Sequence, residues 1–383
     1  MGGLVLITGG AGFIGSSLAE ALLSEGKRVR IMDNFSPQIH SNQSLPDCLQ
    51  DRVQLIKADV RDREALRGAL IGVTELVHLA AETGTGQSMY EIEKYFSVNV
   101  QGTAALIDLL QNDGCGSEIR SIIVASSRAV YGEGAYLCPE HNLVFPGQRN
   151  PVEMIKGDFE PHCPYCGAGL QLGKTSENAP FQPMSFYGLT KQVQEQAILL
   201  YAQVRGINAF ALRYQNVYGP GQSLKNPYTG ILAVFSNLAR QNQDIEIYED
   251  GNESRDFVYI DDVVEATCRS INFSGKFIGP LNVGSDHAVS VINVAQEIKK
   301  YFGSSSAIRI TGAFRAGDIR HNLADISNLE KILEYVPRTS FKIGLANFLE
   351  WAAGQKVGDK EAYLRSVNEL SSHGLMGCKA KIA

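Results

Sequence analysis

The chain has 383 residues, of which 44% are hydrophobic and 20% charged, and its formal net charge is −6. Its hydrophobic share lies close to that of globular proteins, which argues against a disordered chain, and its acidic balance offers no general attraction to nucleic acid or to an anionic membrane. No uncharged apolar run approaches the ~18 residues of a membrane span, and the N-terminus lacks a signal-peptide pattern. We therefore expect a globular, cytoplasmic protein that binds neither nucleic acid nor membrane.

The first third of the chain alternates short apolar runs with helical patterns. Strands are expected at residues 4–8, 28–33, 53–57, 75–79 and 121–125, and helices at residues 13–24, 63–70 and 91–110. Apolar strands separated by helices are typical of βαβ units and of a parallel sheet covered on both faces. The pattern predicts a doubly wound α/β fold of the Rossmann type.

A proline-rich segment at residues 132–183 interrupts this alternation. Regular patterns then resume with a helix at 185–204, a strand at 209–213, helices at 231–241, 261–271, 291–301 and 342–353, and short strands near 246–248 and 308–311. A loop as long as 132–183 is uncommon in a compact domain unless it has a function. We expect a first domain at 1–213, to which the chain returns around 255–285, and a smaller α/β lobe at 214–383 with a disordered tail from about residue 371.

A glycine-rich string, Thr8 to Gly15 (TGGAGFIG), lies between the first expected strand and the first helix. Glycines there allow a tight turn and a close approach of backbone N–H groups to a pyrophosphate at the helix N-terminus. Asp33 ends the second strand, where a carboxylate accepts hydrogen bonds from ribose hydroxyls and favours NAD over NADP. The alternative is a plain tight turn with an unrelated acidic residue. The flanking strand and helix favour NAD binding.

Tyr187 and Lys191 are four residues apart on the expected helix 185–204, so they project from one face. An ammonium near a phenol stabilises the phenolate and suits the phenol to proton transfer. Taken alone, such a pair is ordinary surface decoration of a helix. Ser126 and Ser127, however, end the fifth strand at the sheet edge where α/β folds bind ligands, and a hydroxyl there can orient a reacting oxygen.

At this point the sequence resembles the extended short-chain dehydrogenase/reductase superfamily and, within it, the nucleotide-sugar epimerases and dehydratases. The matching strings are TGGAGFIG (8–15), HLAA (78–81), NVQGT (99–103), SSRAVYGEG (126–134), YGLTK (187–191), RYQNVYGP (213–220), RDFVYIDD (255–262) and GDIRHNLADIS (317–327). The resemblance runs from residue 1 to about 355. It implies that Tyr187 is the catalytic acid and base, Lys191 its activator and a ribose ligand, and Ser127 the hydroxyl partner.

The resemblance also implies two sets of binding residues. The expected NAD ligands are Gly9, Gly12, Phe13, Ile14, Gly15, Asp33, Asn34, Asp59, Val60, Leu79, Ala80, Ala81, Asn99, Tyr187 and Lys191. The residues expected to hold the nucleotide sugar are Ser127, Arg128, Asn216, Arg255, Arg315 and Asp318. Arginine suits this task because its planar fork of donors matches pyrophosphate oxygens, although Arg255 beside Asp256 would by itself more often be a structural ion pair.

The residues that follow Ser127 favour one reaction within this family. The 4,6-dehydratases have an Asp-Glu pair there to expel water from the sugar, whereas this chain has Arg128 and Ala129. A 4-epimerase needs only the tyrosine, lysine and serine together with tightly held NAD. A 4-ketosugar reductase and a regulatory scaffold that binds NAD without chemistry stay open as alternatives.

The proline-rich segment contains two short motifs of metal-ligand type, Cys138-Pro-Glu-His141 and Cys163-Pro-Tyr-Cys166. Two such knuckles supply four ligands, the pattern of a structural zinc site, and a metal would order a loop that has no core of its own. With all four positions filled by protein, a catalytic zinc is not expected. The alternative is four unrelated, reduced side chains.

This insert, with strings such as NFSPQIH (34–40) and AETGTGQSM (81–89), is similar to a bacterial subgroup of dTDP-L-rhamnose 4-epimerases, which make dTDP-6-deoxy-L-talose. UDP-hexose and UDP-uronate 4-epimerases are the alternatives. Thr83, Thr85 and Gln87 are candidate sugar ligands or plain polar loop residues. The family resemblance further implies a homodimer through helices 91–110 and 185–204, although their apolar residues are equally compatible with packing on the sheet.

Overall fold

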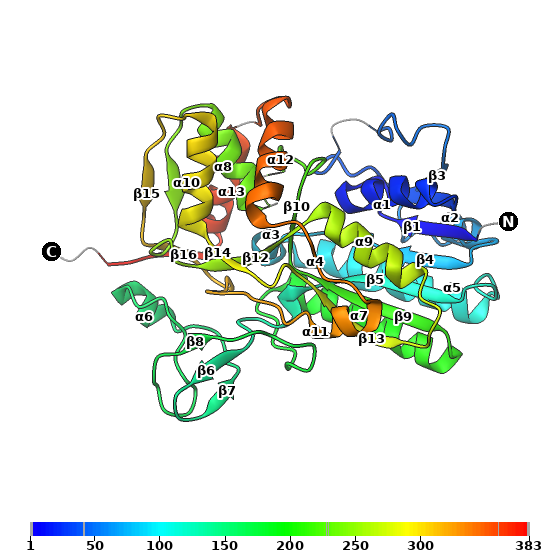
Figure 1. Ribbon diagram of the computed structural model, residues 1–383, viewed down its shortest axis with the longest axis horizontal. Helices are drawn as coiled ribbons and strands as arrows, with labels where there is room; N and C mark the ends of the chain where they lie inside the picture. The colour runs from blue at the N-terminus through cyan, green and yellow to red at the C-terminus, as the bar shows by residue number, and fades with distance from the viewer. Residues whose placement is uncertain (1–2, 41–42, 227, 229, 359, 381–383) are drawn as a thin grey trace.

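The computed structural model describes residues 3–40, 43–226, 228, 230–358 and 360–380, and within them seven strands form one parallel sheet (Figure 1). Its order is β3-β2-β1-β4-β5-β9-β13, with every neighbouring pair parallel. The strands are β1 (Leu4–Thr8), β2 (Arg28–Asp33), β3 (Gln54–Lys57), β4 (Glu75–His78), β5 (Ser121–Ser127), β9 (Asn208–Tyr214) and β13 (Ile278–Val283). The predicted doubly wound α/β fold is confirmed.

Helices cover both faces of this sheet. On one face α1 (Phe13–Ser24) and α9 (Ile260–Ile271) share a hydrophobic core with β1, β5 and β9. On the other face α2 (Arg63–Leu70), α5 (Gly102–Asn112) and α7 (Phe186–Arg205) pack into a second core around Leu66, Leu106 and Ile198, all fully buried. The edge at which the strands end is left free for ligands, as expected for this class of sheet.

The helix predicted at 91–110 is three consecutive pieces in the structure: α4 (Ile92–Tyr95), a π-helical segment η1 (Phe96–Gln101) and α5. The π-helical segment contains Asn99, which is fully buried and hydrogen-bonds both the main chain of Glu82 and the hydroxyl of Thr190. A local change of register of this kind often marks a functional site. A short helix, α3 (Thr85–Ser88), precedes these pieces.

The second lobe lies on the other side of the strand ends (Figure 1). Its helices are α8 (Ile231–Arg240), α10 (Val291–Phe302), α12 (Phe341–Ala353) and α13 (Lys360–Ser372), and α11 (Ser327–Leu333) packs beside β13. Its strands are β10 (Asn216–Tyr218), β11 (Ile245–Ile247), β12 (Ser254–Tyr259), β14 (Ala288–Ser290), β15 (Ile308–Ile310), β16 (Ala313–Arg315) and β17 (Met376–Cys378). The chain returns to the large sheet between these elements, at β13.

The tail provides one correction. We expected no structure from residue 371 onward, but α13 continues to Ser372 and β17 pairs antiparallel with β16. Main-chain hydrogen bonds to a neighbouring strand order this segment, and its small and polar side chains gave no sign of that pairing. Residues 381–383 lie outside the described residues.

The proline-rich segment forms a small unit of its own, at the lower left of Figure 1. Its strands β6 (Tyr136–Cys138), β7 (Asn142–Val144) and β8 (Gln171–Leu172) form one antiparallel sheet. The helix α6 (Pro151–Lys156) lies between β7 and β8 in the chain. The small sheet buries one apolar cluster of four residues, Tyr136, Cys138, Val144 and Cys163, while Ala179 and Phe159 belong to two further small clusters shared with the rest of the molecule. A core of that size is far too small to order the segment by hydrophobic burial alone.

Candidate active site

A cavity of about 610 Å³ opens at the carboxyl ends of the sheet strands, between the sheet and the second lobe. Most of the residues that the sequence nominated lie on its wall. They are Gly9, Gly12, Phe13, Ile14, Gly15, Asp33, Asn34, Asp59, Val60, Leu79, Ala80, Ala81, Thr83, Thr85, Ser127, Arg128, Tyr187, Lys191 and Asn216.

The glycine-rich turn between β1 and α1 is built so that only glycine fits. Gly9 has a positive φ of 70°, and a Cβ there would lie 2.8 Å from the main-chain nitrogen of Ala80. A Cβ on Gly15 would lie 2.6 Å from the Cα of Gly10. The turn therefore brings bare backbone to the start of α1 at Phe13, whose unpaired N–H groups and positive dipole end face the cavity. These residues fit the pyrophosphate of NAD.

Asp33 stands at the end of β2 with only 7% of its surface exposed. One carboxylate oxygen accepts a hydrogen bond from the main-chain N–H of Ala11 (3.0 Å) and the other from that of Phe35 (2.8 Å). The side chain is thus fixed as an acceptor where a ribose diol would lie. Nearby, the pKa of Asp59 is lowered to about 2, chiefly by its hydrogen bonds from Arg61, so this carboxylate is charged at neutral pH.

The catalytic candidates come together where α7 meets the end of β5. Ser185 caps α7 by accepting a hydrogen bond from the N–H of Gly188, and a Cβ on Gly188 would lie 2.5 Å from the carbonyl oxygen of Ala129. This close approach sets Tyr187 beside Ser127. Burial raises the pKa of Tyr187, and a hydrogen bond with Ser127 and the charge of Arg128 oppose that rise.

Lys191 is 2% exposed, and its Nζ donates to the side-chain oxygen of Gln194 (2.9 Å). Burial lowers the pKa of Lys191 to about 7. The ammonium therefore exchanges its proton near neutral pH, which suits a group that assists a tyrosine in proton transfer.

A buried hydrogen-bond network lies beneath this pair. His78 at the end of β4 bonds the hydroxyl of Thr8 (2.7 Å) through Nδ1 and that of Thr103 (3.0 Å) through Nε2, and Gln194 donates to Thr103 (2.9 Å). Burial, reinforced by the charge of Lys191, lowers the pKa of His78 to about 3. The imidazole is therefore neutral at physiological pH and serves as part of the scaffold below the lysine.

Of the residues nominated for NAD or the nucleotide sugar, five lie off the cavity wall: Gln87, Asn99, and the charged residues Arg255, Arg315 and Asp318. Gln87 is 3% exposed, and its side-chain oxygen accepts hydrogen bonds from Gln38 (2.9 Å) and from Tyr95 (3.2 Å). Asn99 holds the loop at Glu82, which itself lines the cavity. The side chains of Gln87 and Asn99 support residues of the wall.

The candidate diphosphate ligands form a charged cluster beside the cavity. The carboxylate of Asp318 accepts hydrogen bonds from Arg255 (3.2 Å) and Arg315 (2.9 Å). Burial alone would raise the pKa of Asp318, but the charges of Arg315, Arg255 and Arg128 hold it well below its usual value. Among the described residues, the buried Nε of Arg315 has no hydrogen-bond partner. A buried donor of this kind fits an anionic ligand.

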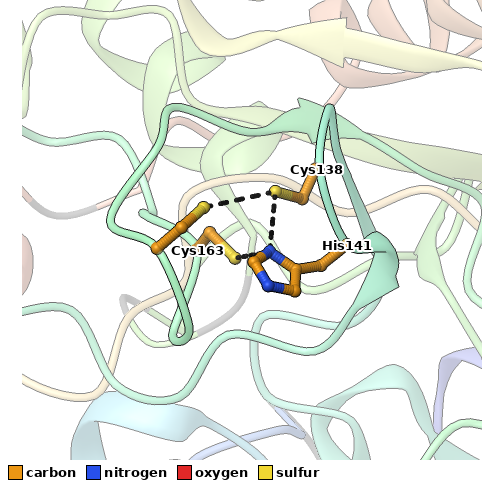
Figure 2. A group of neighbouring side chains, drawn as sticks. Cys138, His141 and Cys163 are labelled. Carbon is orange, nitrogen blue, oxygen red and sulfur yellow. Dashed lines mark hydrogen bonds between the residues drawn. The ribbon is translucent and has the colours of Figure 1, made fainter.

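The four nominated metal ligands also come together in the insert, and Figure 2 labels three of them, Cys138, His141 and Cys163. The Nδ1 of His141 lies 3.6 Å from the Sγ of Cys138 and 3.6 Å from that of Cys163, and the Sγ atoms of Cys138 and Cys166 are 3.7 Å apart. All four ligand atoms lie within 4.8 Å of one another. Tetrahedral zinc, with Zn–S of about 2.3 Å and Zn–N of about 2.0 Å, would separate its ligands by about 3.5–3.8 Å. The donor set and its spacing fit zinc.

The structure adds wall residues that the sequence did not nominate. They include His40, Glu82, Gln215, Gln222 and Tyr228. Gln215 and Gln222 flank the nominated stretch around Asn216, and the string YQNVYGPGQ was a usable signal for them. His40 reaches the site from the irregular segment after β2; it ends the string NFSPQIH (34–40), which indicated a subgroup but gave this residue no role. No helix in the described part of the chain has the length and apolar character needed to cross a membrane.

A glycine cradle, a fixed acceptor after β2 and a Tyr-Lys pair on one cavity define an NAD-dependent enzyme of the doubly wound α/β class. Comparison with known families agrees, because the model of the NAD dependent epimerase/dehydratase family matches residues 5–154 and 162–284. The chain therefore belongs to the NAD-dependent epimerase/dehydratase family.

Named relatives refine this picture. The chain is 39% identical over 351 residues to a dTDP-L-rhamnose 4-epimerase of Burkholderia thailandensis, covering 91% of this chain and 94% of that protein. It is 30% identical to a putative UDP-glucose 4-epimerase of Methanocaldococcus jannaschii, covering 91% of this chain and 98% of the other. Among solved structures it is similar to MoeE5 in complex with UDP-glucuronic acid and NAD, with a TM-score of 0.71, 29% identity, and coverage of 92% and 99%.

Proposed function

We propose that the protein is a nucleotide-sugar 4-epimerase that inverts C4 of a dTDP-6-deoxyhexose and so interconverts dTDP-L-rhamnose and dTDP-6-deoxy-L-talose. The observation that carries the proposal is the meeting of Ser127, Tyr187 and Lys191 on the cavity that also holds the NAD cradle. Arg128 and Ala129 stand where a dehydrating enzyme of the family would need two acids. The similarity to the Burkholderia thailandensis enzyme supports this choice of substrate.

In this reaction NAD, when bound, would take the C4 hydride of the sugar and later return it to the opposite face. Tyr187 removes the proton from the C4 hydroxyl and gives it back, and because the hydride also returns to the sugar, the reaction is redox-neutral overall. Ser127 donates a hydrogen bond that orients the C4 oxygen, and Lys191 stabilises the phenolate. Arg255 and Arg315 hold the diphosphate, so the hexose can turn over about its phosphate linkage while the nucleotide stays in place.

A second candidate, a UDP-uronate 4-epimerase, is favoured by Arg128. Its guanidinium lines the cavity beside Tyr187. Burial lowers the pKa of Arg128 to about 10. The acidic groups around it therefore offset only part of the free-energy cost of burying its positive charge. A sugar carboxylate would supply the missing anion. A diphosphate oxygen would do so as well, which is compatible with the deoxyhexose.

The deciding experiment offers the purified enzyme dTDP-L-rhamnose, UDP-glucose and UDP-glucuronate separately, without added reductant, and follows isomers by proton NMR. We expect dTDP-6-deoxy-L-talose from the first substrate only. Turnover of UDP-glucuronate alone would select the second candidate. In a separate incubation with NADH and a dTDP-4-keto-6-deoxyhexose, consumption of NADH would identify a ketosugar reductase. No isomer from any substrate, with NAD retained, would favour the non-catalytic scaffold.

We further propose that the insert holds one structural zinc through Cys138, His141, Cys163 and Cys166. With four protein ligands the metal has no open position for chemistry, and it would replace the hydrophobic core that this segment lacks. Elemental mass spectrometry should find about one zinc per chain. A stoichiometry near zero in freshly purified protein would refute the zinc site while leaving the proposed epimerase reaction untouched.

We also propose a homodimer formed by the helical segment at 91–110, which comprises α4, η1 and most of α5, and by α7. The C-terminal half of α7 carries exposed apolar side chains, with Leu200 63% and Val204 70% exposed. Apolar groups of this kind on the outer side of a helix suit a partner surface. Sedimentation velocity tests the dimer, and Val204→Lys should shift the protein towards monomer.

A further inference from the structure

The two candidate diphosphate arginines depend on one short turn of the second lobe, residues 317–320, which we call the anchor turn. Arg255 donates to the carbonyl oxygen of Ile319 (2.8 Å) and to that of Arg320 (2.9 Å). The side chain of Asp318 then joins Arg255 to Arg315. A shift of the anchor turn would therefore displace both cations.

Two residues of the insert hydrogen-bond the anchor turn as well. Nη2 of Arg149 donates to the carbonyl oxygen of Asp318 (3.0 Å), and the carboxylate of Glu133 accepts a hydrogen bond from the main-chain N–H of Arg320 (2.9 Å). Arg149 and Glu133 also form an ion pair (3.0 Å), and their side chains are only 4% and 0% exposed. The second lobe contributes Glu249, 2.8 Å from Arg149.

The two residues that grip the turn are tied to the part of the insert that carries the metal ligands. The hydroxyl of Tyr136 donates to Glu133 (3.2 Å), and Tyr136 lies on β6, which ends at Cys138. Nη1 of Arg149 donates to the carbonyl oxygen of Phe159 (3.0 Å), shortly before Cys163. Short stretches of backbone at 136–138 and 159–163, together with these hydrogen bonds, thus connect the knuckle through Arg149 and Glu133 to the anchor turn.

We propose that Arg149 is a positioning residue for the substrate's diphosphate, and that the insert thereby sets the enzyme's affinity for nucleotide sugar. The inference rests on the proposed function, in that it takes the cluster of Arg255, Arg315 and Asp318 as the diphosphate site. Arg149 touches neither the NAD cradle nor Tyr187, so its effect is on substrate binding and not on the chemical step. The insert is then part of the substrate site although none of its metal ligands lines the cavity.

The test uses Arg149→Lys in the full-length enzyme. Lysine keeps the positive charge, but its single ammonium cannot replace the planar fork that bonds Glu133, Glu249 and Asp318 together. Calorimetric Kd values for dTDP and UDP, and KM for whichever nucleotide sugar turns over, are expected to rise about tenfold, with kcat, NAD content and zinc content unchanged. Glu133→Gln, which retains shape and an acceptor, should give a smaller rise in the same direction.

A matched control is Lys174→Met, which removes an exposed ion pair (2.7 Å) between the insert and Asp286. It should behave like the wild-type enzyme. The proposal is overturned if Arg149→Lys binds dTDP and UDP as the control does, or if it lowers kcat and NAD content together with affinity.

One further variant separates this inference from the proposed function. If Arg255→Met leaves the binding of dTDP and UDP unchanged, the assignment of the diphosphate site is wrong, and the role of Arg149 falls with it. If Arg255→Met weakens binding while Arg149→Lys does not, the diphosphate site stands and the positioning role alone is refuted.

Discussion

His78 should make the protein sensitive to mild acid. In the unfolded chain a histidine titrates near pH ~6.5, whereas burial lowers the pKa of the folded His78 to about 3. Below pH ~6.5 His78 binds a proton in the unfolded state but not in the folded state. The free energy of unfolding therefore decreases as the pH is lowered through the window between these two values. Between pH 7.5 and 5.0 this one group should cost about 2 kcal/mol of unfolding free energy.

The assay is urea unfolding at pH 7.5 and 5.0 in saturating NAD, with the wild-type chain compared with His78→Gln. Glutamine can keep hydrogen bonds to the hydroxyls of Thr8 and Thr103 but cannot be protonated. The variant is expected to be less stable at pH 7.5, yet to lose about 2 kcal/mol less than wild type when the pH is lowered.

The control for this comparison is His287→Gln, which replaces an exposed histidine of the second lobe and should leave the acid-induced loss as it is. If the wild type and His78→Gln lose the same stability between the two pH values, the account of a neutral, buried imidazole is wrong.

Three further outcomes follow from the site. Tyr187→Phe should lower kcat by at least roughly 10²-fold while NAD content, read from the absorbance of the denatured supernatant, stays at the wild-type value; unchanged turnover would exclude the phenol as acid and base. Gly15→Ala should lose bound NAD and about 1–3 kcal/mol of stability, because the new methyl group would lie 2.6 Å from the Cα of Gly10; normal cofactor content would contradict the tight-turn argument. Cys166→Ser should lower the metal content and expose residues 132–183 to limited proteolysis, and an unchanged digestion pattern would show that the insert is ordered without its fourth ligand.

The large sheet could be predicted from the sequence because its signals are local. Six of its strands are apolar runs bounded by glycine or by helical patterns, and the cofactor turn carries glycines at fixed spacing. The seventh, β13 (Ile278–Val283), contains Pro280 and lies on the edge of the sheet, so its run looked weaker than the others. The tail strand β17 was missed because strand pairing across the lobe leaves no trace in a short, glycine-containing segment.

The residues of the candidate site likewise fall into those that the sequence could predict and those that it could not. Many residues that touch the cavity could be nominated, because glycine spacing, a strand-end serine and the Tyr-Lys pair each have a chemical reason, whereas wall residues from irregular segments, such as His40, could not. Supporting residues such as Gln194, which holds Lys191, could not, because their partners come from distant parts of the chain. Gln87 was a candidate sugar ligand because it lies in the loop after β4. Its side chain instead points away from the cavity and hydrogen-bonds Tyr95 and Gln38.

The insert begins and ends at the same place. The main-chain N–H of Gln182 donates to the carbonyl oxygen of Val130 (2.9 Å), so the excursion leaves the body and rejoins it through adjacent backbone. Geometry alone would allow a tight bend to replace the whole detour and still connect Ser127 to Tyr187. Given the proposed role of Arg149, such a deletion would leave Ser127, Tyr187 and Lys191 in place but remove the support that the insert gives to the turn held by Arg255.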